Sequence, residues 1–123
     1  MVRHAESTFP KECCGVMVGV EGVVTRAVTL PNVYDGPQED FFVMDPRDLA
    51  RVDEEARKAG ASVLGVFHSH PDCDAYFSKR DLENSCPWFS YLVLSIKSGS
   101  FDHANSYRCD YDQTRADKEE LFY

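Results

Sequence analysis

Short apolar runs rich in β-branched side chains mark the expected strands of this 123-residue chain. Residues 16–20 and 23–28 are two such runs, and the Glu21-Gly22 pair between them predicts a β-hairpin. Residues 62–67, Ser-Val-Leu-Gly-Val-Phe, form the most apolar run, which is typical of a central strand buried on both faces. Residues 91–96 predict one more strand.

Shorter elements are expected around these strands. Residues 2–8 predict a helix that ends at Phe9-Pro10, because a residue before proline avoids helical backbone angles. Residues 32–40 contain glycine and proline and predict a loop, and a short strand is expected at residues 41–43. The acidic end of the chain predicts irregular backbone with one helical turn near residues 118–121.

The clearest helix is expected from Pro46 to Ala59. Asp45 can cap its first turn, proline suits the first helical position, and Gly60 can end the helix in a left-handed conformation. A second, shorter helix is expected from Ser78 to Asn84. The apolar positions of the first helix that share one face are Leu49, Val52, Ala56 and Ala59.

Composition and charge narrow the class of protein. With 43% hydrophobic residues the chain can fill one core, and its length predicts a single domain over residues 1–123. The net charge of −8 and the lack of a cationic stripe argue against nucleic acid as a partner. The apolar runs are shorter than the roughly 18 residues of a membrane span, and no signal segment is evident, so a soluble, cytoplasmic protein is expected.

The cysteines argue against a disulfide framework. Their number is odd and no C-x-x-C spacing occurs, which also disfavours a four-cysteine zinc site. Buried free thiols in a reducing cytoplasm are expected. The residues are Cys13, Cys14, Cys73, Cys86 and Cys109.

Two histidines follow the most apolar run. In an extended strand, residues two apart project to the same side, so His68 and His70 can present their imidazoles to one point. Asp81, near the start of the second helix, could add a carboxylate. Two histidines and one aspartate leave a fourth position open around an ion, which is typical of a catalytic zinc site.

Each part of this pattern also has a purely structural interpretation. Ser78-x-x-Asp81 is a helix start in which the serine caps the helix and the carboxylate lies at the positive end of the helix dipole. A His-x-His pair can be the polar rim of a sheet. Glu12 alone indicates almost nothing. Capping and metal binding can coexist, because a carboxylate in the first turn can also point at an ion.

Together these residues resemble the motif of the JAMM metalloproteases of the MPN domain family, written E…H-[ST]-H-x7-S-x2-D. Its five positions are occupied by Glu12, His68, His70, Ser78 and Asp81. The resemblance implies an α/β fold with a curved mixed β-sheet flanked by helices, the MPN/JAMM (cytidine-deaminase-like) architecture. It extends beyond the motif to residues 9–15, 44–49, 65–67 and 87–95, which are similar to the short prokaryotic members.

The resemblance also implies an activity, that of a zinc metallopeptidase or isopeptidase. His68, His70 and Asp81 would bind one catalytic Zn²⁺. Glu12 would be the general acid and base, and Ser78 would help to stabilise the oxyanion. The implied substrate is a ubiquitin-like sulfur-carrier protein cleaved at a peptide or isopeptide bond at its C-terminus, with release of cysteine as one option.

Other interpretations stay open. The main alternative is a non-catalytic MPN scaffold for protein interactions, although all five motif residues are present. A zinc deaminase would need P-C-x-x-C, and here Cys86-Pro87 has the wrong order. Fewer residues precede Glu12 than is usual in the family, so the sheet is expected to lack an edge, which a second copy could supply in a homodimer. Cys73 is expected to be an ordinary loop cysteine rather than a ligand.

Overall fold

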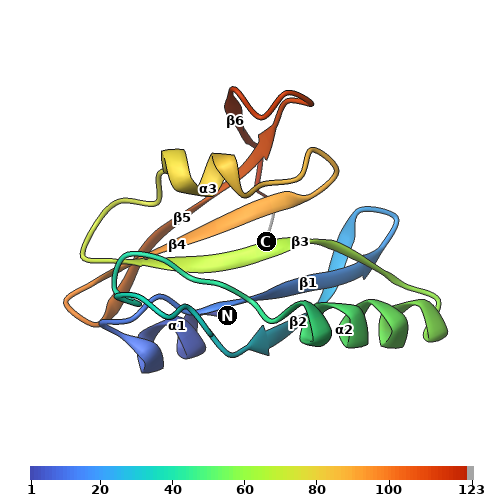
Figure 1. The fold of residues 1–123 in the computed structure, drawn as a ribbon, viewed down its shortest axis with the longest axis horizontal. Helices are drawn as coiled ribbons and strands as arrows, with labels where there is room; N and C mark the ends of the chain where they lie inside the picture. Colours follow the sequence, from blue (N-terminus) through green and yellow to red (C-terminus); the bar gives the residue numbers. More distant parts are fainter. Residues whose placement is uncertain (122–123) are drawn as a thin grey trace.

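The computed structural model describes residues 1–121, which form a twisted, mixed six-stranded sheet with helices packed against it (Figure 1). The strand order is β2-β1-β3-β4-β5-β6, and only β3 and β4 run parallel among the described pairs. The expected α/β class is confirmed. The helices are α1 (Val2–Thr8), α2 (Pro46–Lys58) and α3 (Lys79–Glu83); the strands are β1 (Cys14–Val20), β2 (Val23–Leu30), β3 (Ser62–Pro71), β4 (Ser90–Lys97), β5 (Ser100–Cys109) and β6 (Ala116–Glu119).

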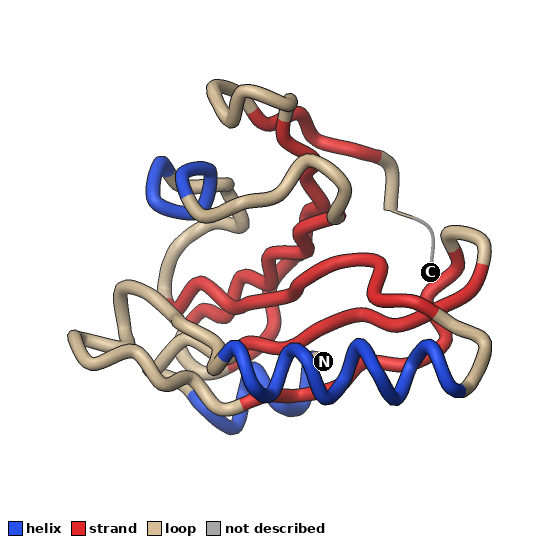
Figure 2. Tube along the Cα trace, turned by 45° about the vertical axis from the view of Figure 1, so that its right-hand side comes forward, coloured by secondary structure: helices blue, strands red, loops and turns tan. Residues whose placement is uncertain are grey.

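Hydrophobic clusters cover both faces of the sheet, because side chains alternate along each strand. Phe67 of β3 packs in a cluster with Ala5 of α1, whereas its neighbour Val66 packs in another with Val52 of α2. The long helix α2 runs along the strands (Figure 2). Strand β3 therefore lies between two cores, which explains why its consecutive residues are apolar.

Local turn and capping chemistry sets several element boundaries as predicted. The β1–β2 hairpin turns at Glu21 and Gly22, whose positive φ angles of 51° and 79° are those of a tight hairpin turn. Asp45 Oδ1 accepts a hydrogen bond from Arg47 N at 2.9 Å at the start of α2. Gly60, with a φ of 75°, follows its end. Across residues 1–121 no helix has the length and apolar character to cross a membrane.

The prediction of a strand at Phe41–Val43 is wrong, because this segment belongs to a loop. Its backbone bonds to the preceding loop instead of a neighbouring strand: Asn32 donates to Phe41 O and accepts from Val43 N, and Val33 N donates to Val43 O. Asn32 therefore fixes the conformation of the loop that contains Phe41 and Phe42.

The C-terminal part also differs from expectation. Residues 116–119 form β6 rather than a helical turn, because they pair with β5, where Ser106 Oγ donates to Glu119 Oε1 at 2.8 Å. Strand β5 is not among the strands predicted from the sequence. Its residues are mostly polar, so it lacks the apolar pattern that marks the other central strands.

Val52 allows a test of the core beneath α2. Its side chain is 1% exposed and packs with Val16 and Val66. Val52→Ala should lower the free energy of unfolding by about 2 kcal/mol, measured by urea denaturation, because buried carbon is lost and a cavity remains. The same truncation at Val24, which is 42% exposed on β2, should cost less than about 0.5 kcal/mol. Equal effects at both positions would contradict the core assignment.

Candidate active site

His68 and His70 lie near the carboxyl end of β3 and are both buried. Their Nε2 atoms are 3.1 Å apart, so the prediction that the two rings point to one place is confirmed. His70 Nδ1 lies 3.1 Å from the carbonyl oxygen of Asp74. Because a carbonyl oxygen only accepts, Nδ1 carries the hydrogen, and Nε2 keeps the lone pair that a metal ligand needs.

Asp81 meets the two histidines from the first turn of α3. Its N–H donates to Ser78 Oγ and its Oδ2 accepts from Ser78 N, each at 3.0 Å, which makes a complete capping box. The same Oδ2 lies 3.3 Å from Nε2 of His68 and from Nε2 of His70. Capping and convergence thus occur together, because the cap holds the carboxylate against the two rings.

The three converging atoms are spaced as metal ligands. They lie between 3.1 and 3.3 Å from one another. Zinc–ligand bonds of about 2.0–2.1 Å in tetrahedral geometry place neighbouring ligand atoms roughly 3.3–3.4 Å apart, so the trio fits such an ion. Nδ1 of His68 has no hydrogen-bond partner within residues 1–121, so the polar contacts of this ring are made at Nε2. The trio is therefore a candidate metal centre.

Burial and hydrogen bonds set the charges of this trio. Burial lowers the pKa of His68, which keeps its ring neutral near pH 7. Burial alone would raise the pKa of Asp81, but the two imidazoles whose Nε2 atoms lie 3.3 Å from its Oδ2 outweigh burial and hold that pKa well below its usual range. A neutral imidazole and an ionised carboxylate are the forms that bind a divalent cation.

Glu12 precedes β1, and its side chain is buried, with 6% exposure. Its Oε1 has no hydrogen-bond partner among the described residues. Burial, with smaller contributions from the negative charges of Asp81 and Asp40, raises the pKa of Glu12 to about 9. A buried carboxylate without partners is costly unless water or a cation lies beside it. The unpartnered Oε1 of Glu12 is therefore open to a water molecule or a cation at this position.

Two hollows meet at Asp81, which lines both. The smaller one, here called the acidic cavity, has a volume of about 140 Å³. Four carboxylates line it and, among the described residues, no lysine or arginine does. It unites Glu12 with three other motif residues. Its lining is Glu12, Glu39, Asp40, His70, Pro71, Cys73, Tyr76, Ser78 and Asp81.

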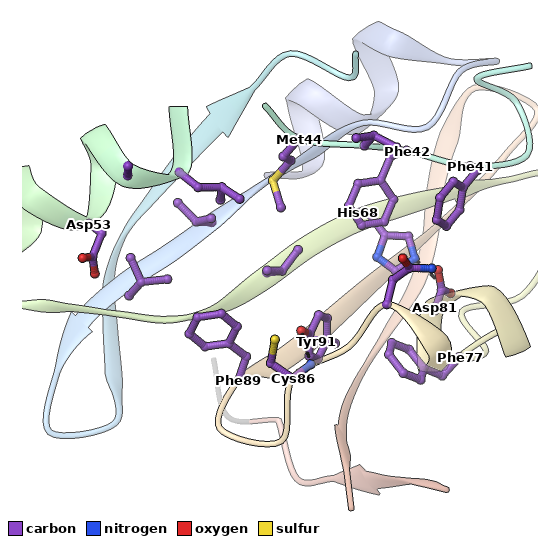
Figure 3. A pocket seen from close by; sticks show the side chains of 17 residues that line it. Phe41, Phe42, Met44, Asp53, His68, Phe77, Asp81, Cys86, Phe89 and Tyr91 are labelled. Carbon is purple, nitrogen blue, oxygen red and sulfur yellow. Dashed lines mark hydrogen bonds and ion pairs between the residues drawn. The ribbon is translucent and has the colours of Figure 1, made fainter. Parts of the chain in front are cut away.

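The larger hollow, here called the apolar groove, has a volume of about 460 Å³. His68 and Asp81 lie side by side at one of its ends, and Asp53 of α2 lies far from them (Figure 3). Between these ends the lining is mainly aliphatic and aromatic. It includes Val16, Phe41, Phe42, Val43, Met44, Leu49, Val63, Val66, Phe77, Phe89 and Tyr91.

Two aromatic residues that pack on the candidate metal centre are not among the predicted site residues. Phe42 stacks on His68 with ring centroids 4.6 Å apart, and Tyr76 meets the edge of His70 at 4.9 Å. In the sequence, the Phe41–Phe42 pair after a polar loop could have indicated an aromatic contact at the site, but such a pair is equally compatible with a strand.

Cys73 lies in the acidic cavity but outside the group of three candidate ligands that the described residues contain. Burial raises its pKa, which disfavours the thiolate that binds a metal. All five cysteines are free thiols in the described chain, and three are buried, as the composition indicates.

The sequence and fold of this chain are similar to those of known proteins. The sequence profile of Prok-JAB, described as prokaryotic homologs of the JAB domain, matches residues 1–110. The chain belongs to the Prok-JAB family. The matched region contains the three candidate ligands, Glu12 and Ser78, so the whole candidate site lies within it.

Relatives of this Prok-JAB protein include two proteins named desampylase. The one from Pyrococcus furiosus is 36% identical over 95 residues, which cover 77% of this chain and 66% of that protein. The one from Haloferax volcanii is 35% identical over 89 residues, covering 70% and 63%. The chain thus spans slightly less than two thirds of each desampylase. A CysO-cysteine peptidase of Mycobacterium tuberculosis is 29% identical over 111 residues, covering 88% and 75%.

Solved structures show the same fold. The solution structure of DSY2949 from Desulfitobacterium hafniense matches this Prok-JAB protein with a TM-score of 0.83 and 32% identity, over 99% of this chain and 84% of that chain. The JAB1/MPN domain protein AF2198 from Archaeoglobus fulgidus matches with a TM-score of 0.63 and 20% identity, over 98% and 86%. The expected MPN/JAMM architecture is confirmed.

Proposed function

We propose that this Prok-JAB protein is a zinc-dependent hydrolase that cleaves a peptide or isopeptide bond at the C-terminus of a ubiquitin-like sulfur-carrier protein. The observation that carries the proposal is the convergence of three ligand-type atoms at a cavity that also holds Glu12, whose Oε1 has no partner within residues 1–121. The names of the relatives, desampylase and CysO-cysteine peptidase, support this substrate class.

The proposed chemistry divides between an ion and Glu12. His68, His70 and Asp81 would hold zinc, which when bound makes water nucleophilic near neutral pH and polarises an amide carbonyl. Glu12 takes the proton of the attacking water and delivers it to the leaving nitrogen. Its raised pKa makes the carboxylate a stronger base than an exposed glutamate, and a bound cation beside it would lower this pKa so that the group is ionised near pH 7.

Ser78 can stabilise the developing oxyanion without giving up its cap. Its Oγ accepts from Asp81 N through a lone pair, so the hydroxyl hydrogen remains free to donate. The side chain lines the acidic cavity together with Asp81. A hydrogen-bond donor aimed at the oxyanion contributes roughly 3–4 kcal/mol to transition-state stabilisation.

Ser78→Ala should lower kcat by about 10²–10³-fold and leave zinc content unchanged. It should also destabilise the fold by about 1 kcal/mol, because the cap of α3 is lost. Ser78→Gly separates the two effects: glycine is tolerated at a cap, so stability falls less while kcat falls equally. Ser78→Thr keeps the hydroxyl and should retain most activity. Full activity of Ser78→Gly, measured by steady-state kinetics, would rule out the oxyanion role.

The two hollows support an orientation for the substrate. Glu12 has to reach the leaving nitrogen, so the leaving group lies on the side of the acidic cavity. The apolar groove then receives the carrier's C-terminal tail. Glu39 and Asp40 add negative charge on the leaving-group side. This charge favours a lysine side-chain amine over a free cysteine, whose carboxylate lies next to the cleaved bond.

A carboxylate on the leaving group should therefore slow cleavage. For a carrier that ends in a peptide-linked cysteine, conversion of the terminal carboxylate to an amide should raise kcat/KM about 3–10-fold. The double variant Glu39→Gln, Asp40→Asn should reduce this preference, and so should added salt. Release of the two leaving groups is measured by mass spectrometry. Equal rates for both substrates in the wild type would contradict the proposed orientation.

The test of the function combines metal analysis with substrate cleavage. The purified protein should hold about one zinc ion per chain, lose the ion and its activity to a chelator, and regain both on addition of zinc. Ubiquitin-like carriers with a C-terminal cysteine or a lysine-linked adduct serve as substrates, and mass spectrometry identifies the released group. Zinc without release from any carrier would reject the substrate class. If the protein held no zinc and released nothing, the scaffold alternative would be favoured.

A further inference from the structure

Asn32 lies in the loop between β2 and α2 and is not one of the five motif residues. We propose that Asn32 is a positioning residue, which fixes the backbone of Glu12 and ties it to the wall of the apolar groove. The inference rests on the proposed function, because it concerns the placement of the proposed base.

The Asn32 side chain uses its full hydrogen-bonding capacity. Its Nδ2 donates to the carbonyl oxygens of Glu12 and Phe41, both at 3.1 Å. Its Oδ1 accepts from the N–H groups of Tyr34 and Val43, both at 3.1 Å. An asparagine has two donor hydrogens and two acceptor lone pairs, so all four are engaged. Two carbonyl partners and two N–H partners also leave one possible orientation of the amide.

The same loop holds the other polar group of the Glu12 backbone. Glu12 N donates to the carbonyl oxygen of Gln38 at 2.7 Å. Gln38 Nε2 in turn donates to Asn32 O at 2.9 Å and to Tyr34 O at 3.1 Å, which closes the loop on itself. The N–H and the carbonyl of Glu12 are therefore both bound by this loop.

This loop continues directly into the wall of the apolar groove. Phe41, Phe42 and Val43 line the groove, and Phe42 stacks on His68. Asn32 thus bonds to the backbone of the proposed base and to the backbone of the groove wall. A shift of the wall would therefore reach Glu12 through the Asn32 side chain, next to the backbone bond from Glu12 N to Gln38 O. A displacement of about 1 Å in a catalytic group can cost 10²-fold in rate, so the bond matters for turnover.

Asn32→Asp is the sharpest test, because it keeps the size and an accepting oxygen but replaces the donating amide by an oxygen that faces two carbonyls. We expect kcat to fall about 10–100-fold, with KM changed less than about threefold and zinc content unchanged. In the Glu12→Gln background the same change should alter the residual kcat by less than about twofold, because no base remains to be positioned. A merely structural role would lower kcat equally in both backgrounds.

Hydrogen exchange gives a readout that is independent of turnover. The amide of Glu12, bonded to Gln38 O, should exchange at least about tenfold faster in Asn32→Asp, whereas the amides of β4 should be unchanged. Gln113→Glu is the matched control, since Gln113 also donates its amide to backbone carbonyls, those of Glu83 and Ser85, away from Glu12. This control should keep wild-type kcat.

A wild-type kcat in Asn32→Asp, or an equal loss in both backgrounds, would overturn the inference and leave the proposed function standing. If Asn32→Asp does not fold, Gln38→Glu carries the same test, because it loosens the loop without altering Asn32. A loss of kcat that disappears in the Glu12→Gln background supports the inference, and an unchanged kcat overturns it. A wild-type protein that releases nothing from any carrier would reject the proposed function and this inference with it.

Discussion

Glu12→Gln is expected to lower kcat by about 10²–10⁴-fold while zinc binding is retained. Glutamine has nearly the shape of glutamate but cannot take up the proton of the attacking water. Glu12 does not belong to the group of three candidate ligands, so the substitution leaves all three in place. Single-turnover rates and zinc content per chain measure the two effects separately. Activity within about twofold of the wild type would contradict the role of Glu12 as the base.

The same variant has a second signature in the zinc-free protein. The pKa of Glu12 is raised from 4.5 to about 9 in the folded chain, first by burial and then by Asp81 and Asp40. Between pH 4.5 and about pH 9, Glu12 has lost its proton in the unfolded chain but keeps it in the folded chain. The free energy of unfolding of the wild type therefore falls as the pH rises through this window. Glu12→Gln lacks this effect and should gain stability relative to the wild type between pH 5 and pH 8, measured by urea unfolding with a chelator present.

The convergence of His68, His70 and Asp81 can be predicted from sequence because each part depends on local geometry. The period of two along an extended strand brings His68 and His70 to one side of β3. The serine cap places Asp81 in the first turn of α3, facing the two rings. Only the path of the short connection between β3 and α3 is left open by such reasoning.

Glu12 depends on contacts that no local pattern encodes. It reaches the site because β1 pairs with β3 in a register that sets Cys14 opposite His68. The adjacent Cys13 N–H also donates to Ser69 Oγ at 2.7 Å, which holds the segment before β1 against the histidine strand. The family motif indicates Glu12, but the residues around it in the sequence do not.

Strand β5 was unpredictable for a related reason, since most of its residues are polar and several of them bind a loop. His103 Nε2 accepts from Ala75 N at 3.0 Å, while Asn105 Nδ2 and Tyr107 Oη donate to Ala75 O at 3.1 and 2.6 Å. These bonds anchor the loop whose Asp74 carbonyl fixes the tautomer of His70. The hydrophobic periodicity of the sequence does not indicate such hydrogen bonds, and it does not indicate those of the Asn32 loop either.

His68→Gln is expected to abolish zinc binding and to reduce turnover to the uncatalysed background, because two ligand atoms remain where three converge. The effect should also be visible without substrate. Zinc at 100 times its dissociation constant stabilises a folded protein by about 2.7 kcal/mol, so the wild type should show a higher Tm with zinc than with a chelator. The variant should show the same Tm in both conditions.

His4→Gln is the matched control for this experiment, since His4 lies on α1, outside the ligand group. It should keep the zinc content, the zinc-dependent rise in Tm and the activity of the wild type. If His68→Gln kept a zinc-dependent rise in Tm as large as that of the control, the ion would be bound elsewhere. The hydrogen bonds among His68, His70 and Asp81 would then be only a buried structural network.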